Sequence, residues 1–333
     1  FHQIGGSEFE IRSSLAPLIS LKIFDTITGY DYLMETGPKH HFDSVVSRLA
    51  DTSGLTDEKA IYHKAGVAYV EPEMRDLEDC FDVAHRLGSE GLVTVEDLKG
   101  CIHNHTTYSD GASTLSEMAN ASISNGLQYL VICDHSRSAF YAGGLSVEDV
   151  IKQHAEIDSL NLELTPFRVF KGIESDILSD GSLDYPDEVL ESFEVVVASI
   201  HSGLSMTEEK ATERIIKAIE NPFTTILGHP TGRLLLSRKG YPLNHRKVIE
   251  ACAANGVAIE LNAHPYRLDL DWRYLQMAMD LGVPISINPD AHHVNGIKDM
   301  RYGVLVSRKA GIPGSAVLNS RTLQQFESWL GLC

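Results

Sequence analysis

The chain has 333 residues, 43% of them hydrophobic, and a formal net charge of −18 at pH 7. This length and apolar content are enough for one large core and a small extra domain, so we expect a globular protein. The acidic balance argues against binding to nucleic acid through a broad basic face, but it leaves room for a narrow pocket of positive charge.

The first 97 residues show no regular pattern. We expect a strand at residues 8–14, a glycine turn at Gly37-Pro38 and a helix at residues 39–51. An irregular acidic stretch follows. We therefore interpret residues 1–97 as a small α+β domain that ends in a linker near residues 71–97.

From residue 98 the sequence alternates between short apolar runs rich in Val and Ile and segments of helical length. The seven apolar runs are at residues 99–105, 128–135, 167–174, 194–201, 224–229, 256–262 and 283–290. The helices are expected at residues 114–126, 146–164, 206–221, 243–256 and 269–282. Strands that alternate with helices form a parallel sheet, and seven repeats favour a closed or nearly closed barrel.

The sequence shows no signal for a membrane or for export. It has no run of about 18 consecutive apolar residues, and its first residues have neither a basic nor an apolar region. The cysteines are odd in number and scattered along the chain: Cys80, Cys101, Cys133, Cys252 and Cys333. This usage is typical of a reducing compartment, so we expect a cytoplasmic protein.

Polar residues able to bind a metal follow the carboxyl end of each expected strand. They are His103, His105, Asp110, His135, Glu174, His201, His229, Asp290 and His292, with Asp134 and Asn262 beside them. A single histidine at a strand end is most often structural, but seven strand ends in a row are not accidental. In a barrel all these ends meet at one mouth, which is where such enzymes build their active sites.

His103 and His105 are spaced as two residues on one side of a strand, so one cation can bind both. Nine ligands exceed what one ion needs, which indicates two or three divalent ions that share a bridging carboxylate. Imidazole and carboxylate donors without thiolate favour Zn²⁺, Mn²⁺ or Fe over Ca²⁺. We interpret the remaining histidines as structural, and leave open whether His264 faces the mouth.

The ordered motifs HNHTTYSDG, ICDHS, GIESDIL, ASIHSG, LGHPTGRLL and NPDAHH carry a family resemblance. They resemble the PHP (polymerase and histidinol phosphatase) superfamily of metal-dependent phosphoesterases, and most closely the C-terminal PHP domain of bacterial family X DNA polymerases. The resemblance covers about residues 92–330. It implies a distorted (βα)7 barrel, which we place at residues 98–333.

The resemblance also implies how three ions are shared. One ion would lie between His103, His105, Glu174 and Asp290. A second would lie between Glu174, His201 and His229, so that Glu174 bridges the two. A third would lie among Asp110, His135 and His292.

The first region resembles the segments that precede the PHP domain in those polymerases, at TGPKHH (residues 36–41) and VAYVEPEMRD (residues 67–76). The sequence lacks a helix-hairpin-helix domain and a Gly-Ser plus Asp-x-Asp palm motif. Nucleotide transfer is therefore not expected, and residues 1–97 look like a polymerase remnant.

These residues predict metal-assisted hydrolysis of a phosphate ester without a covalent intermediate. The ions would lower the pKa of a shared water from about 15.7 toward 7. We expect Glu174, His201 and Asp290 to be catalytic together with Arg233, whose guanidinium would hold the phosphate. Arg137 and Arg301 are further candidates for that contact.

The resemblance implies DNA 3′ ends as the substrate, attacked by a 3′–5′ exonuclease or a 3′-phosphatase. A small phosphomonoester such as histidinol phosphate or a nucleotide is the alternative. Two other readings stay open: an amidohydrolase, which also begins with His-x-His, and a metal-stabilised scaffold without activity. The third ligand set, with Asp110 and His135, disfavours the amidohydrolase, and the complete set of nine disfavours the scaffold. No protein partner is indicated.

Overall fold

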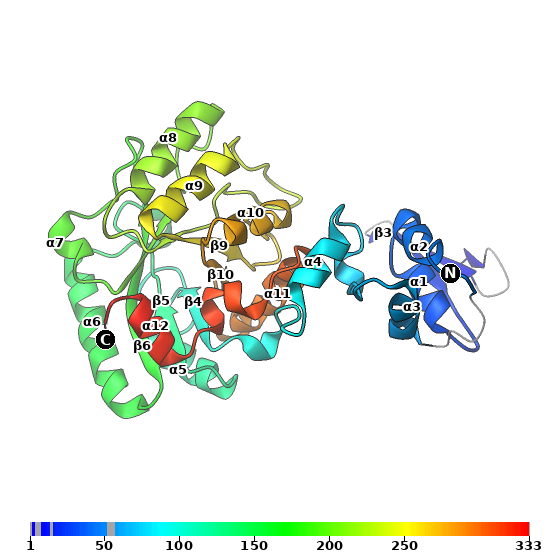
Figure 1. Cartoon of the computed structure of the whole chain (residues 1–333). Helices are drawn as coiled ribbons and strands as arrows, with labels where there is room; N and C mark the ends of the chain where they lie inside the picture. The colour runs from blue at the N-terminus through cyan, green and yellow to red at the C-terminus, as the bar shows by residue number, and fades with distance from the viewer. Residues whose placement is uncertain (1, 4–7, 14–15, 52–56, 333) are drawn as a thin grey trace. The chain divides into compact units, whose positions relative to one another are not determined.

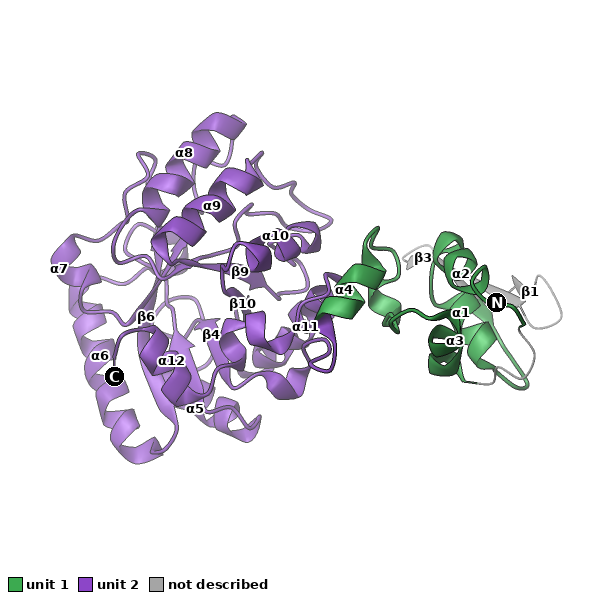
Figure 2. Ribbon diagram, viewed as in Figure 1, with its two compact units in different colours: residues 1–86 green, residues 87–333 purple. Residues whose placement is uncertain are grey.

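The computed structural model describes residues 2–3, 8–13, 16–51 and 57–332, with side chains from residue 21 onward. It forms two compact units, Phe1–Arg86 and Leu87–Cys333 (Figure 2). The backbone amide of Val93 donates to the carbonyl of Ile312, and Leu98 lies in the core of the second unit. Residues 87–97 therefore belong with the barrel, and the division lies earlier in the chain than the position after residue 97 that we expected.

The first unit combines a small antiparallel sheet with short helices (Figure 1). Its elements are β1 (His2–Gln3), β2 (Glu8–Ser13), β3 (Ala16–Lys22), α1 (Gly29–Glu35), α2 (Lys39–Val46), α3 (Glu58–Ala65), η1 (Pro72–Met74) and α4 (Cys80–Leu87). The strand expected at residues 8–14 is β2, with Ser14 outside the described residues. The helix expected at 39–51 begins as predicted but ends at Val46. Within the first unit, the side chain of Arg75 is buried. It pairs with Glu58 at 2.7 Å and donates to the carbonyl of Val70.

The second unit contains a seven-stranded sheet in which every strand pair is parallel. The strand order is β10-β9-β8-β7-β6-β5-β4, and a bridge between Asn104 and Ala291 joins the two edges. The strands are β4 (Gly100–Asn104), β5 (Tyr129–Ile132), β6 (Arg168–Asp176), β7 (Val195–Ser199), β8 (Ile226–Leu227), β9 (Ala258–Asn262) and β10 (Ile285–Asn288). The seven predicted strands and the nearly closed, distorted (βα)7 barrel are thus confirmed.

The helices of this unit either connect successive strands on the outside of the barrel or follow the last strand (Figure 1). They are α5 (Leu115–Ser124), α6 (Val147–Leu164), α7 (Asp187–Leu190), α8 (Glu208–Ile219), α9 (His245–Asn255), α10 (Leu275–Asp280), α11 (Met300–Lys309) and α12 (Leu323–Trp329), with short 3₁₀ turns η2 (Val95–Asp97), η3 (Phe140–Ala142), η4 (Trp272–Tyr274), η5 (Val294–Asp299), η6 (Gly314–Ala316) and η7 (Leu318–Ser320). Side chains of Thr114, Ser146, Thr207 and Asn244 cap the helices that follow them. The helix expected at residues 269–282 is shorter, because its first part forms η4.

The apolar side chains of the strands divide between two cores. One core lies between the strands and the surrounding helices. The other includes Val131, Phe170 and Ile226, and here the ring of Phe326 from α12 stacks on Tyr129 at 4.5 Å. Gln128, at the amino end of β5, accepts from the amide of Leu323 at the start of the same helix. Helix α12 therefore packs at the amino ends of the strands, and the polar residues gather at the carboxyl ends.

Candidate metal centre

The nine residues expected to bind metal lie at or just beyond the carboxyl ends of six strands, and the structure brings them together. Three groups of side chains each offer ligand atoms within 4.8 Å of one another. The groups are His103, His105 and Asp290; His105, Asp110, His135 and His292; and His135, Glu174 and His201. His105 and His135 each belong to two groups, so the three positions adjoin.

His103 and His105 reach the mouth through an irregular end of strand β4. The pairing of β4 with β5 shifts register between Cys101 and Asn104, and His103 has a left-handed φ of 62°. Asp290, on the far edge of the sheet, also has a left-handed φ, of 53°. Such conformations are costly for residues other than glycine and cluster at functional sites. The two imidazoles do converge, with ring centroids 5.3 Å apart. The irregular end of β4 sets their orientation, and simple strand alternation does not.

Glu174 lies at the centre of the arrangement. Its carboxylate oxygens lie 3.7 Å or less from nitrogens of five imidazoles, those of His103, His105, His135, His201 and His229. Burial opposes the negative charge of Glu174, but the neighbouring histidines lower its pKa well below the usual value. The carboxylate is therefore ionised, and it is placed to bridge two ligand groups.

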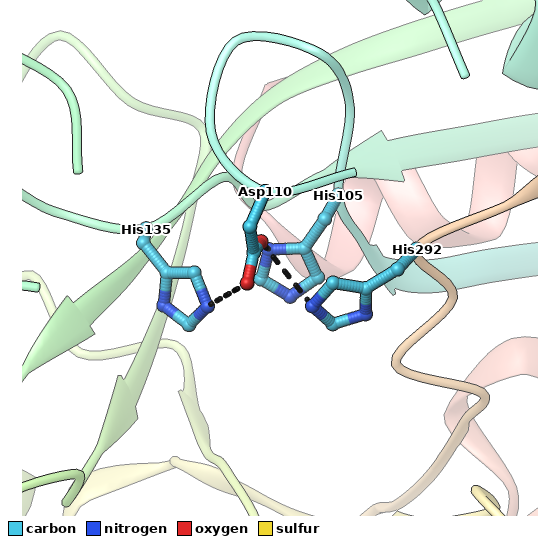
Figure 3. A group of neighbouring side chains, drawn as sticks. All are labelled: His105, Asp110, His135 and His292. Carbon is cyan, nitrogen blue, oxygen red and sulfur yellow. Dashed lines mark ion pairs between the residues drawn. The ribbon is translucent and has the colours of Figure 1, made fainter. Parts of the chain in front are cut away.

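Asp110 joins three imidazoles from separate loops (Figure 3). Its carboxylate lies 3.6 Å from His135 Nε2, 3.3 Å from His292 Nε2 and 3.7 Å from His105 Nδ1. The rings of His105 and His292 stack with centroids 4.1 Å apart. The end of β4 and the loop after it thus contribute to two ligand groups.

The buried imidazole nitrogens of this cluster fit a cation. Both ring nitrogens of His105, Nε2 of His103 and Nδ1 of His229 are buried without a hydrogen-bond partner. Buried polar atoms are rarely left unpaired, and neutral imidazole nitrogens are good metal ligands. Burial and the charge of His135 lower the pKa of His105 to about 3, so this ring is neutral. The donor set suits Zn²⁺, Mn²⁺ or Fe.

A buried glutamate that the sequence analysis missed supports the ligands from behind. Glu260, on β9, lies 2.6 Å from His103 Nδ1 through one oxygen and accepts from the backbone amide of His229 at 2.6 Å through the other. The side-chain amides of Asn288 and Asn262 also donate to it, at 2.7 and 3.3 Å. A carboxylate at Nδ1 leaves Nε2 of His103 free to face a metal.

Of two nearby aspartates, Asp176 contacts a ligand side chain and Asp134 contacts the loop after β4. Asp176 Oδ1 lies 2.5 Å from His201 Nδ1. Asp134, which the sequence placed beside the mouth, is fully buried and accepts from the amide and hydroxyl of Thr106 and from Gln153. Asp176 follows Glu174 by two residues on the same strand face, so its position could have been predicted.

The arginines differ in their relation to the ligands. Arg267, which the sequence analysis did not select, has its Nε 3.3 Å from Asp290 Oδ2. Arg233 instead donates to the carbonyls of Arg267 and Leu268 and pairs with Asp271 at 2.8 Å. It therefore holds the loop that carries Arg267, and its contact with phosphate stays a prediction.

Three other candidates lie outside the ligand groups. Arg137 donates to the carbonyl of Asp184, and Arg301 donates to the hydroxyl of Tyr302 on helix α11. His264 uses its ring Nδ1 to accept from the amide of Tyr266 within a local turn.

Two further observations concern the chain as a whole. Among the described residues no helix is long and apolar enough to cross a membrane. Cys80, Cys101, Cys133 and Cys252 are buried free thiols, and Cys333 lies outside the described residues.

Comparison with known proteins agrees with this geometry. Residues 102–264 match the model of the PHP domain. The chain is 41% identical over 273 residues to the DNA polymerase/3'-5' exonuclease PolX of Bacillus subtilis, a match that covers 82% of this chain and 48% of that protein. The chain thus spans about half the length of this relative.

Other relatives match over most of their length. The chain is 33% identical over 239 residues to a protein of Acetivibrio thermocellus named "Probable phosphatase", covering 68% of this chain and 93% of that one. The crystal structure of the histidinol phosphate phosphatase of Lactococcus lactis, complexed with zinc, L-histidinol and phosphate, aligns at 19% identity with a TM-score of 0.46, over 64% of this chain and 94% of that one. The family model and the Acetivibrio relative show that the chain belongs to the PHP-domain family of metal-dependent phosphoesterases.

Proposed function

We propose that the second unit hydrolyses phosphodiester bonds at the 3′ ends of DNA, with two or three divalent ions held by the nine residues at the mouth of the barrel. The observation that carries the hydrolytic part is the shared position of Glu174, whose carboxylate faces imidazoles of two adjoining ligand groups. Ligand groups that share residues are typical of sites where adjacent ions act on one phosphate.

The bound ions would polarise the phosphate and supply a water activated for attack. The protein's own residues prepare this chemistry. His103 and His201 are each fixed by a carboxylate at Nδ1, so their Nε2 atoms face Glu174 at 3.2 Å. Arg267 brings a positive charge to the edge of the cluster, where it can bind a non-bridging phosphate oxygen. Arg233 positions Arg267 by binding its carbonyl oxygen.

The choice of DNA 3′ ends rests on the relative from Bacillus subtilis, whose name includes a 3′–5′ exonuclease and whose identity with this chain is 41%. A phosphatase acting on a small phosphomonoester is the second candidate. It is favoured by relatives named "Probable phosphatase" that match this chain over most of their own length, such as the Acetivibrio protein, of which 93% is covered.

One comparison separates the two candidates. Purified protein is supplied with Mn²⁺ or Zn²⁺, and its rates are measured on single-stranded DNA labelled at the 5′ end and on a panel of phosphomonoesters. We expect stepwise shortening of the DNA from its 3′ end. Hydrolysis of the small esters with intact DNA would instead support the second candidate.

The variants test the assignment of residues. Replacing His103 by Ala together with Glu174→Gln removes ligands from adjoining groups, so all metal-dependent hydrolysis should disappear while the fold persists. His154 is a matched control, because it lies on helix α6 and its ring packs on Phe193. The variant His154→Gln should keep full activity. Activity retained in the double variant would contradict the proposed centre.

A further inference from the structure

Four large apolar side chains are exposed on loops at the carboxyl ends of the strands. Phe140 and Tyr141, in turn η3 after strand β5, are 84% and 72% exposed. Leu236, in the loop after β8, is 106% exposed, and Tyr266, in the loop after β9, is 63% exposed. Large apolar groups left in water near a polar site commonly mark a binding surface.

Tyr141 borders one side of the ligand cluster. Its ring centroid lies 6.2 Å from that of His135 and 6.5 Å from that of His201. Partial loss of solvent around the ring and the charges of Asp176 and Glu174 raise the pKa of the Tyr141 hydroxyl, so the side chain is neutral. Phe140 precedes it on the same turn. An exposed pair of aromatic rings therefore adjoins the metal-ligand group that contains His135 and His201.

Tyr266 borders the cluster from another loop. The next residue, Arg267, reaches Asp290 at 3.3 Å, while Tyr266 itself projects into solvent. The carbonyl of Tyr266 accepts from the amide of Leu235 at 2.6 Å, which ties the loop after β9 to the turn that carries Leu236. Tyr266 and Leu236 therefore lie on neighbouring loops, next to the Asp290 ligand group.

Leu236 is held outward by its own turn. The backbones of Leu234 and Arg238 exchange two hydrogen bonds, of 2.9 and 2.7 Å, and Leu236 at the tip has a left-handed φ of 63°. Leucine rarely adopts this conformation, and here it does so without burying its side chain. Two exposed cationic residues, Arg238 and Lys239, follow the tip. The turn thus offers an apolar tip beside positive charge.

We propose that Phe140 and Tyr141 on one loop, and Leu236 and Tyr266 on the other two, hold the bases of a single-stranded DNA 3′ end whose phosphate lies at the metal ligands. This inference rests on the proposed function. It adds that the protein recognises the terminal bases of the DNA as well as the phosphate. Aromatic rings stack on any base, and apolar side chains wedge between bases. A small phosphomonoester has no second base to cover these groups, so it gives no reason for their exposure.

The test removes a protein side chain and a substrate base, separately and together, and compares the effects on binding. Binding of a fluorescein-labelled single-stranded oligonucleotide is measured by anisotropy with Ca²⁺ present, together with its hydrolysis with Mn²⁺. Tyr266→Ala and Leu236→Ala are each compared with the parent protein, on an intact oligonucleotide and on ones with an abasic site at the last or penultimate position. The matched control is Leu162→Ala, because Leu162 is 85% exposed on helix α6.

We expect Tyr266→Ala to weaken binding of intact DNA roughly 5- to 150-fold, as for loss of one stacked base. The loss should shrink toward onefold on one of the abasic oligonucleotides, because the partner base is already missing. Hydrolysis of p-nitrophenyl phosphate, which has no base, should be unchanged in both variants, and Leu162→Ala should behave as the parent protein on every substrate.

The outcomes separate this inference from the proposed function. Equal losses on intact and abasic DNA, or no loss at all, would overturn the role of these side chains even if DNA is cleaved. Base-dependent binding without cleavage would support the inference and contradict the proposed function. A change of oligomeric state in the variants, seen by light scattering without a change in DNA affinity, would show that the exposed groups face a second copy of the chain.

Discussion

The buried carboxylate of Glu260 gives a prediction about the metal centre that does not depend on substrate. Its two oxygens meet four donors: His103 Nδ1 and the amide of Asn288 at one oxygen, the backbone of His229 and the amide of Asn262 at the other. In Glu260→Gln the new NH₂ group replaces one of the two oxygens and must face the pair of donors at that position. If it faces His103, that ring accepts at Nδ1 and carries its proton on Nε2, the atom that should bind metal.

The magnitude follows from the kind of contact that is lost. A carboxylate behind a metal-binding histidine typically contributes a factor of about 10–100 in metal affinity. If the NH₂ group instead faces the amide of His229, a buried donor is left without an acceptor, which costs about 1–3 kcal/mol of folding free energy. One orientation therefore lowers the affinity for metal, and the other lowers the stability of the folded barrel. Glu260→Gln should lower the affinity for one ion roughly 10-fold or more.

The assay is competition of the protein with a chromogenic chelator for Zn²⁺, accompanied by thermal unfolding with and without metal. Glu213→Gln is a suitable control, because Glu213 is an exposed glutamate on the outer helix α8. Unchanged Zn²⁺ affinity and thermal stability in Glu260→Gln would refute the role of this carboxylate in fixing His103.

Three further predictions concern other parts of the chain. Arg267→Ala should slow phosphoester hydrolysis about 10-fold or more, since a charged hydrogen bond to phosphate is lost, whereas Arg273→Ala, at an exposed arginine in the same region, should not; equal steady-state rates for the two would count against Arg267. Removing metal with a chelator should lower the melting temperature of the barrel by several degrees, and restoring it should reverse the change, because ions bind only the folded mouth; a melting curve unaffected by chelation would argue against bound ions. Burial and the charge of Arg75 lower the pKa of His41 to about 4. As the pH falls from 6.5 to 4, this histidine therefore binds a proton in the unfolded chain but stays neutral in the folded one. The first unit should therefore lose up to about 3 kcal/mol over that range, seen as faster hydrogen exchange in α2 and α3, and His41→Phe should abolish this pH dependence.

The barrel and its mouth were predictable because their signals are local. Each buried strand is a short apolar run, and most ligands lie at the end of a run or within two residues after it, as His201 follows β7 and His229 follows β8. Parallel strands bring their carboxyl ends to one side, so the convergence of these side chains required no knowledge of loop structure. The positions of the ligands relative to the strands were sufficient to predict that these side chains meet at one end of the barrel.

The missed residues depend on features that sequence periodicity does not report. Glu260 lies inside a strand that reads as apolar, and three of its four donors come from three other segments, the fourth being Asn262 on its own strand. Arg267 reaches Asp290 from a loop that Arg233 helps to hold, and in the sequence either arginine alone resembles a solvated surface residue. The left-handed conformation of His103 also escaped prediction, since it accompanies an irregular pairing of β4 with β5, two strands separated in the sequence. The left-handed conformation of Asp290 had no signal in the sequence either.

The central claim is that several ions, bound at the mouth of the barrel, drive cleavage of DNA at its 3′ end. The most direct test titrates metal-free protein with Mn²⁺ or Zn²⁺ while measuring both bound ions per chain, by elemental analysis, and the rate of release of 3′-terminal nucleotides from single-stranded DNA. The account predicts that the rate stays low until more than one ion is bound, and that Glu174→Gln neither binds the full number of ions nor cleaves. Full cleavage by metal-free protein, or with a single ion per chain, would contradict it.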